Sequence, residues 1–156
     1  MKKQLTIGLF GFGCVGTGLY EVLNKTTLLQ ASIKHIVIKD LGKKRIIDAA
    51  YFSADANRIL EDEEINVVVE LINDYEAAYE IVTRALKAGK HVVSANKKLI
   101  AYYLDELVSL AKENNVSFLY EASVGGSIPI IRNLEEYYDN DLLHSIKAIV
   151  NGSTNF

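Results

Sequence analysis

A glycine pattern near the start of the chain constrains its fold more than any other feature. Residues 5–10 form a hydrophobic run, and Gly11, Gly13 and Gly16 follow it in the spacing G-x-G-x-x-G. The next residues place apolar side chains on one helical face, so the segment predicts a strand, a tight turn and a helix. Gly11 would permit the turn, Gly13 would let a pyrophosphate approach the backbone, and Gly16 would let the helix pack closely. The pattern predicts a dinucleotide-binding turn at a helix N-terminus; the alternative is a turn that only packs strand against helix.

Size, composition and charge exclude several classes of protein. The chain has 156 residues, 49% hydrophobic and 24% charged, which suffices for one globular domain with a core. The net charge is −3 and the lysines are scattered, so we expect no nucleic-acid partner. No apolar run approaches the roughly 20 residues that span a bilayer, so we expect a soluble, cytoplasmic protein without a membrane partner. The single cysteine, Cys14, excludes an intramolecular disulfide.

Apolar strands alternate with amphipathic helices along the rest of the chain. This alternation is typical of βαβ units and predicts an α/β fold, a Rossmann-type doubly wound and mostly parallel sheet with helices on both faces. Gly89 stands where a helix should end, and residues 137–141 are polar and turn-prone. Strands are predicted at residues 33–38, 65–71, 91–93, 116–120 and 146–150, and helices at 55–60 (short), 77–86, 104–111 and from Pro129 onward.

Five segments together resemble the homoserine dehydrogenase family. They are the glycine pattern, the strand end at 69–72, Val-Ser-Ala-Asn-Lys-Lys at 93–98, the glycine-rich loop at 120–129 and Asn-Gly-Ser-Thr-Asn-Phe at 151–156. They follow the family's order and spacing, but cover only its nucleotide-binding half. The resemblance implies an NAD(P)-binding Rossmann domain at 1–141 and the first strand of a truncated substrate domain at 142–156.

The resemblance also implies an activity. The family reversibly oxidises L-homoserine to L-aspartate semialdehyde with NAD or NADP, on the route to threonine and methionine, and the full-length enzyme forms a homodimer. Because most of the substrate domain would be missing, we expect the chain alone to be inactive. The alternative is a stand-alone NAD(P)-binding regulatory or sensor module without catalysis.

Lys97 is the predicted catalytic residue. It follows a predicted parallel strand, and ligands of such sheets bind outside the carboxyl ends of the strands. Its ammonium could stabilise a developing alkoxide; without the resemblance, Lys97 and Lys98 would be a solvated pair. The resemblance implies substrate contacts at Lys97, Gly152 and Thr154, and cofactor contacts at Gly11, Phe12, Gly13, Cys14, Val15, Gly16, Lys39, Ile72, Asn73, Ser94 and Lys97.

A monovalent cation, sodium, is implied at the glycine-rich loop. In the family a glutamate carboxylate and backbone carbonyls bind it, which here would be Glu121, Val124, Gly126 and Ile128. Oxygen ligands suit a hard cation. The alternative is an ordinary surface glutamate before a helix.

The choice between NAD and NADP depends on the end of the second predicted strand. An acidic residue there favours NAD and a basic one suits the 2′-phosphate of NADP. Lys39 and Asp40 stand side by side, and three basic residues follow at 43–45, which slightly favours NADP. The alternative is a solvated basic loop. Asn73 and Asp74 stand where the family usually has two glycines, so the loop at the nicotinamide should differ in backbone geometry.

Overall fold

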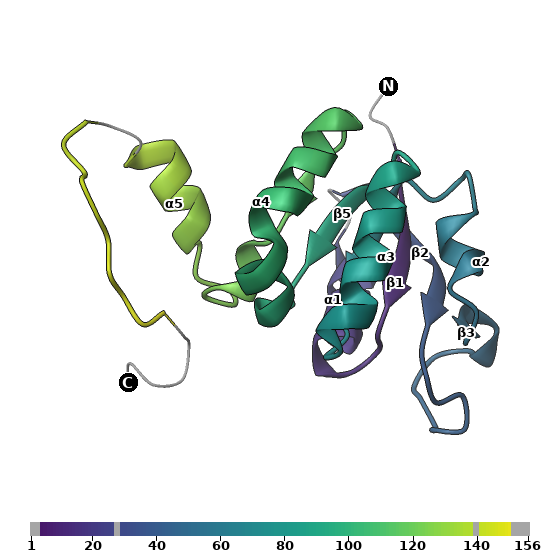
Figure 1. Ribbon diagram of the computed structural model, residues 1–156. Helices are drawn as coiled ribbons and strands as arrows, with labels where there is room; N and C mark the ends of the chain where they lie inside the picture. Colours follow the sequence, from purple (N-terminus) through teal and green to yellow (C-terminus); the bar gives the residue numbers. More distant parts are fainter. Residues whose placement is uncertain (1–3, 27–28, 139–140, 151–156) are drawn as a thin grey trace.

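The computed structural model describes residues 4–26, 29–138 and 141–150. It contains a six-stranded parallel sheet with strand order β3-β2-β1-β4-β5-β6 (Figure 1). The strands are β1 (Leu5–Phe10), β2 (Ala31–Val37), β3 (Phe52–Ser53), β4 (Val67–Glu70), β5 (His91–Ser94) and β6 (Phe118–Leu119). The helices are α1 (Cys14–Lys25), α2 (Asn57–Leu60), α3 (Tyr75–Lys87), α4 (Lys97–Glu113) and α5 (Ile130–Tyr137), with 3-10 turns at η1 (Ala49–Tyr51) and η2 (Glu121–Ser123).

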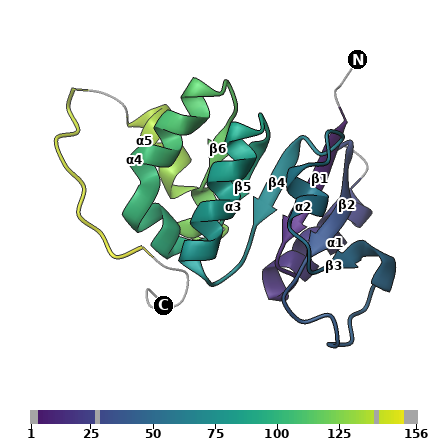
Figure 2. The ribbon, with the colours of Figure 1, turned by 45° about the vertical axis from the view of Figure 1, so that its right-hand side comes forward.

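Helices cover both faces of the sheet, which confirms the predicted fold class. On one face Leu19 and Leu23 of α1 pack against a core built from β1, β2 and β4. On the other face, where α2, α3 and α4 lie, a second core joins these helices to the sheet (Figure 2). Val82 and Leu107 in this core are fully buried. All four residues of β4 are buried, as expected for a strand covered on both sides.

Two helices begin with side-chain caps at the same edge of the sheet. The Asp74 carboxylate accepts a hydrogen bond from the Ala77 N–H at the start of α3, and the Asn96 side chain accepts one from the Leu99 N–H at the start of α4. Both caps follow directly after neighbouring parallel strands, β4 and β5. Gly89 has a φ of 72°, a left-handed conformation that glycine adopts at little cost, so its predicted place after α3 is confirmed.

The structure corrects two predictions about strands. β3 was not predicted, because two residues are too few for a periodic pattern. The strand predicted at 146–150 is not formed: residues 143–150 have no regular structure and run apart from the sheet (Figure 1). Within residues 141–150 no residue is in a strand, and the Ile146 and Ile149 side chains are exposed.

None of the helices in the described ranges is long and apolar enough to cross a membrane. Residues 151–156, which include the predicted substrate contacts Gly152 and Thr154, lie outside the described residues.

Candidate functional site

The strand order of the sheet has a topological switch point between β1 and β4. From β1 the chain proceeds outward to β2 and β3, and it then returns to place β4 on the other side of β1. In open parallel sheets such a reversal leaves a crevice at the carboxyl ends of the strands. The glycine turn follows β1 and therefore lies at this crevice.

The three glycines of the turn have different surroundings. Gly11 has a φ of 92°, and a Cβ there would stand 2.8 Å from the Leu71 carbonyl oxygen. A Cβ on Gly16 would stand 2.7 Å from the Gly11 carbonyl oxygen, so the close packing of helix and turn needs glycine. Gly13 has no protein atom within 4 Å of its Cβ position. Two glycines are therefore needed by the fold itself, whereas Gly13 faces open space.

The N-terminus of α1 is available to an anion. Gly13, the N-cap, provides no side-chain hydrogen bond, and the first turn contains no acidic residue. Cys14 and Val15, the first two residues of α1, are exposed. An uncapped helix start with exposed N–H groups suits a phosphate or pyrophosphate.

Two cavities adjoin at Ile72, which lines both. The α4 cavity, of about 340 Å³, lies between the loops after β4 and β5 and the start of α1. The β2 cavity, of about 320 Å³, lies between the glycine turn, the end of β2 and α3. Among the residues predicted to contact a cofactor, Val15, Asn73 and Lys97 line the α4 cavity; Gly11, Phe12, Gly13 and Lys39 line the β2 cavity.

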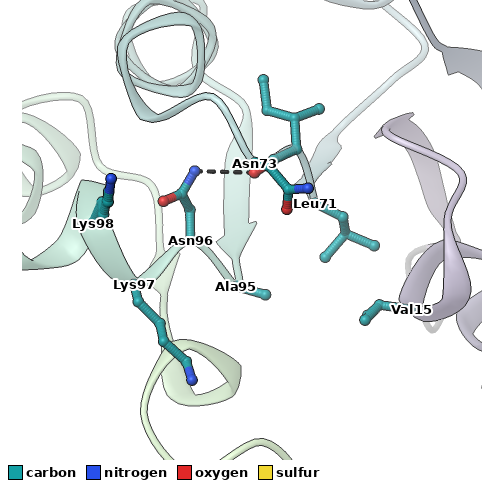
Figure 3. A pocket seen from close by; sticks show the side chains of 8 residues that line it. Val15, Leu71, Asn73, Ala95, Asn96, Lys97 and Lys98 are labelled. Carbon is teal, nitrogen blue, oxygen red and sulfur yellow. Dashed lines mark hydrogen bonds between the residues drawn. The ribbon is translucent and has the colours of Figure 1, made fainter. Parts of the chain in front are cut away.

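Lys97 and Lys98 point in opposite directions from the start of α4 (Figure 3). Lys97 lines both the α4 cavity and a third one, of about 400 Å³, formed with the glycine-rich loop at 122–128. The Lys98 ammonium lies 5.7 Å from the centre of the Tyr75 ring. Both lysines are exposed and both line the α4 cavity, and Lys97 is the one that also lines the third cavity.

A buried carboxylate connects the two loops around the α4 cavity. Glu70, at the end of β4, is fully buried and accepts hydrogen bonds from the Ile72 N–H at 2.7 Å and the Ser94 hydroxyl at 2.6 Å. Burial raises the pKa of Glu70, and these hydrogen bonds act against that rise. Ser94, which was predicted to touch the cofactor, is fully buried and holds Glu70.

Asn96 extends this network to the helix that carries Lys97. Its side-chain nitrogen donates to the Ile72 carbonyl at 3.0 Å, the hydrogen bond drawn as a dashed line from Asn96 in Figure 3. Its backbone N–H donates to the Ser94 hydroxyl at 3.1 Å. Its side-chain oxygen caps α4. Glu70 and Asn96 received no role from the sequence; the available signal was a single acid inside the otherwise apolar run at 67–71.

The charged residues that line the β2 cavity are basic. Lys39 and Arg45 line it. The Asp40 carboxylate accepts from the Gly42 N–H in its own loop, and its residue is not among those that line the cavity. The Lys39 ammonium instead donates to Asp74, across the crevice, at 3.2 Å. The end of β2 therefore presents basic groups to the cavity.

The residues predicted to bind sodium do not all meet. Val124, Gly126 and Ile128 line one cavity together with Lys97. Both carboxylate oxygens of Glu121 are used elsewhere, because they accept from backbone N–H groups at the start of α5. No cluster of three His, Cys, Asp or Glu side chains that could hold a metal occurs in the described part of the chain. A carboxylate oxygen that accepts one N–H keeps a second lone pair, so sodium binding at this loop stays a prediction.

The parallel sheet, the glycine turn at its reversal and the adjoining cavities define a dinucleotide-binding α/β domain. The family described as "Homoserine dehydrogenase, NAD binding domain" matches residues 11–121. The chain is similar to homoserine dehydrogenase of Bacillus subtilis (strain 168), with 38% identity over 99% of this chain and 38% of the relative. The chain belongs to the homoserine dehydrogenase family.

Solved structures agree with this assignment. A homoserine dehydrogenase from Thiobacillus denitrificans superposes with a TM-score of 0.80 and 34% identity, over 86% of this chain and 33% of that one. A hyperthermophilic archaeal homoserine dehydrogenase in complex with NADPH superposes with a TM-score of 0.70 and 28% identity, over 85% of this chain and 48% of that one. The chain thus spans less than half the length of these relatives.

Proposed function

We propose that this chain binds NADP(H) in preference to NAD(H) and forms the cofactor half of a homoserine dehydrogenase. The reaction would be the reversible oxidation of L-homoserine to L-aspartate semialdehyde. The observation that carries the proposal is the open space at Gly13 in front of the uncapped start of α1. A pyrophosphate there would meet backbone N–H groups on a helix N-terminus without displacing any protein atom. The homodimer and the cytoplasmic location stay predictions.

The residues of the chain would bind, orient and stabilise charge. A bound nicotinamide dinucleotide supplies the hydride acceptor or donor. The α4 cavity, between Val15 and Asn96, is the place for the nicotinamide end, because it lies beside α1 at the carboxyl ends of β4 and β5. Lys97 at its border would place an ammonium near the substrate oxygen and stabilise negative charge on it during hydride transfer.

The preference for NADP(H) is supported by the charges at the end of β2. Lys39 and Arg45 line the β2 cavity, where the adenosine end would lie, whereas the Asp40 carboxylate is engaged in its own loop. A 2′-phosphate would meet these cations. The NADPH complex of the archaeal relative is consistent with this choice.

Binding is tested by calorimetric titration of the chain with NADPH and NADH. Gly13→Val should abolish binding of both and leave the melting temperature nearly unchanged, because the new side chain fills the ligand's space and its Cβ has no protein atom within 4 Å. Gly18→Val is the matched control, since Gly18 is also exposed, with no atom within 4 Å of its Cβ position, but lies within α1 away from the turn. Equal affinities in the wild type and Gly13→Val would remove this site from consideration.

Activity is tested in a chimaera in which the chain replaces the matching portion of the Thiobacillus denitrificans enzyme. Homoserine-dependent reduction of NADP⁺, followed by absorbance, is expected. A chimaera that binds the cofactor and oxidises no homoserine would contradict the proposed reaction.

A further inference from the structure

We propose that Asp74 limits the preference of this chain for 2′-phosphorylated dinucleotides by holding Lys39, which lines the β2 cavity, in an ion pair. Asp74 is thus a specificity-determining residue that acts through Lys39. The inference rests on the proposed function, because it concerns how the same crevice distinguishes NADP from NAD.

The ion pair joins two elements on opposite sides of the glycine turn. Lys39 follows β2 and Asp74 follows β4, and these two strands flank β1. The Lys39 ammonium and the Asp74 carboxylate lie 3.2 Å apart, with 82% of the lysine side chain and 44% of the aspartate side chain exposed. Because both groups are exposed, a ligand phosphate could replace the carboxylate as the partner of Lys39 without a buried charge being left unpaired.

The second cation of the cavity cannot move so easily. The Arg45 guanidinium lies 5.0 Å from the centre of the Phe52 ring and donates to the carbonyl oxygens of Asp40 at 2.8 Å and Lys43 at 2.7 Å. Arg45 is therefore a positioned cation, whereas Lys39 is a flexible one whose position depends on Asp74. The carboxylate weakens phosphate binding in two ways, since it competes for Lys39 and repels the phosphate.

The two oxygens of Asp74 have separate duties, which makes the inference testable. One oxygen accepts from the Ala77 N–H at 3.1 Å and caps α3, and the other faces Lys39. The Ala77 hydrogen bond, together with Lys39, holds the pKa of Asp74 below its ordinary value of 3.8, so the group is charged near neutral pH. Asparagine caps helices as well as aspartate does, so Asp74→Asn keeps the cap and removes the charge.

The test is a set of calorimetric titrations with NADP⁺ and NAD⁺ at one fixed ionic strength. Asp74→Asn should tighten NADP⁺ binding by up to about fivefold, the range that an exposed ion pair supports, and leave NAD⁺ binding unchanged. In a Lys39→Ala background, Asp74→Asn should lose most of this effect. Asp40→Asn is the matched control, because it removes the same charge from a nearby carboxylate that accepts from the Gly42 N–H in its own loop, whereas the Asp74 carboxylate accepts from Lys39. Asp74→Ser, another capping residue without charge, repeats the test if the asparagine variant folds poorly.

The outcomes separate this inference from the proposed function. Failure of the wild type to bind either dinucleotide overturns the proposed function. Binding of both with an unchanged NADP⁺ to NAD⁺ ratio in Asp74→Asn and Asp74→Ser overturns the role of Asp74 alone. Weaker NADP⁺ binding in these variants also overturns it, since Asp74 would then help to place Lys39 for the phosphate.

Discussion

Removing the carboxylate of Glu70 should loosen both walls of the α4 cavity. In Glu70→Ala, the Ile72 N–H and the Ser94 hydroxyl lose their acceptor in a fully buried place. Each buried donor left without an acceptor costs about 1–3 kcal/mol, so for two donors we expect a loss of about 2–6 kcal/mol in the free energy of unfolding. Glu70→Gln keeps the volume and one acceptor oxygen and should cost about 1–2 kcal/mol.

The two variants also differ from the wild type in pH dependence. Burial raises the pKa of Glu70 above its ordinary value of 4.5, so the folded chain holds this proton more tightly than the unfolded chain. As the pH rises from about 4.5 through the raised pKa, the folded state loses stability relative to the unfolded state, and above that interval the loss is complete. Glu70→Gln has no such proton and does not lose this stability. The amount by which its free energy of unfolding falls below that of the wild type should therefore shrink as the pH rises.

Urea unfolding followed by circular dichroism measures both effects. The difference in unfolding free energy between the wild type and Glu70→Gln is compared at about pH 4.5 and about pH 7, which cancels the titration of all other groups. A difference that does not change with pH would refute the burial argument. An unchanged stability of Glu70→Ala would show that the hydrogen bonds to Ile72 and Ser94 contribute nothing.

Two further predictions concern the glycine turn and the lysines. Gly16→Ala should lower the free energy of unfolding by about 1–3 kcal/mol, because its Cβ would meet the Gly11 carbonyl oxygen at 2.7 Å; an unchanged melting temperature would contradict this. In the chimaera, Lys97→Ala should lower turnover about a hundredfold or more with cofactor binding intact, whereas Lys98→Ala, whose ammonium lies over Tyr75, should have little effect. Near-normal turnover of Lys97→Ala would show that Lys97, like Lys98, is a solvated lysine that takes no part in the reaction.

The sequence predicts well those features that depend on local pattern. The run at 5–10 and the glycines after it specify β1, the turn and α1, because strand period, turn chemistry and helix period agree there. The position of Lys97 at a crevice follows from the rule that ligands bind at the carboxyl ends of parallel strands. The alternation of strands and helices predicts the parallel sheet but not the order of its strands, which the structure supplies.

The features that the sequence does not predict are contacts between distant loops. Ser94 lies 24 residues from Glu70 along the chain, and Lys39 lies 35 residues from Asp74, so no local period relates them. The prediction of a strand at 146–150 was wrong for a related reason. Its apolar residues, interrupted only by Lys147, satisfy a strand pattern, but a strand also has to pair with another strand, which the pattern does not supply.

Burial decides whether Glu70, the last residue of β4, or Asp74, in the loop that follows, can influence a ligand. Glu70 has no exposed surface, and both of its oxygens accept from the protein, so it can act on the crevice only by fixing the loops that form it. Asp74, four residues later, gives one oxygen to the cap of α3 and turns the other toward an exposed lysine. A ligand phosphate can therefore compete with Asp74 for its partner but cannot compete with Glu70. It follows that changes at Glu70 should affect stability and both dinucleotides alike, whereas changes at Asp74 should separate NADP from NAD.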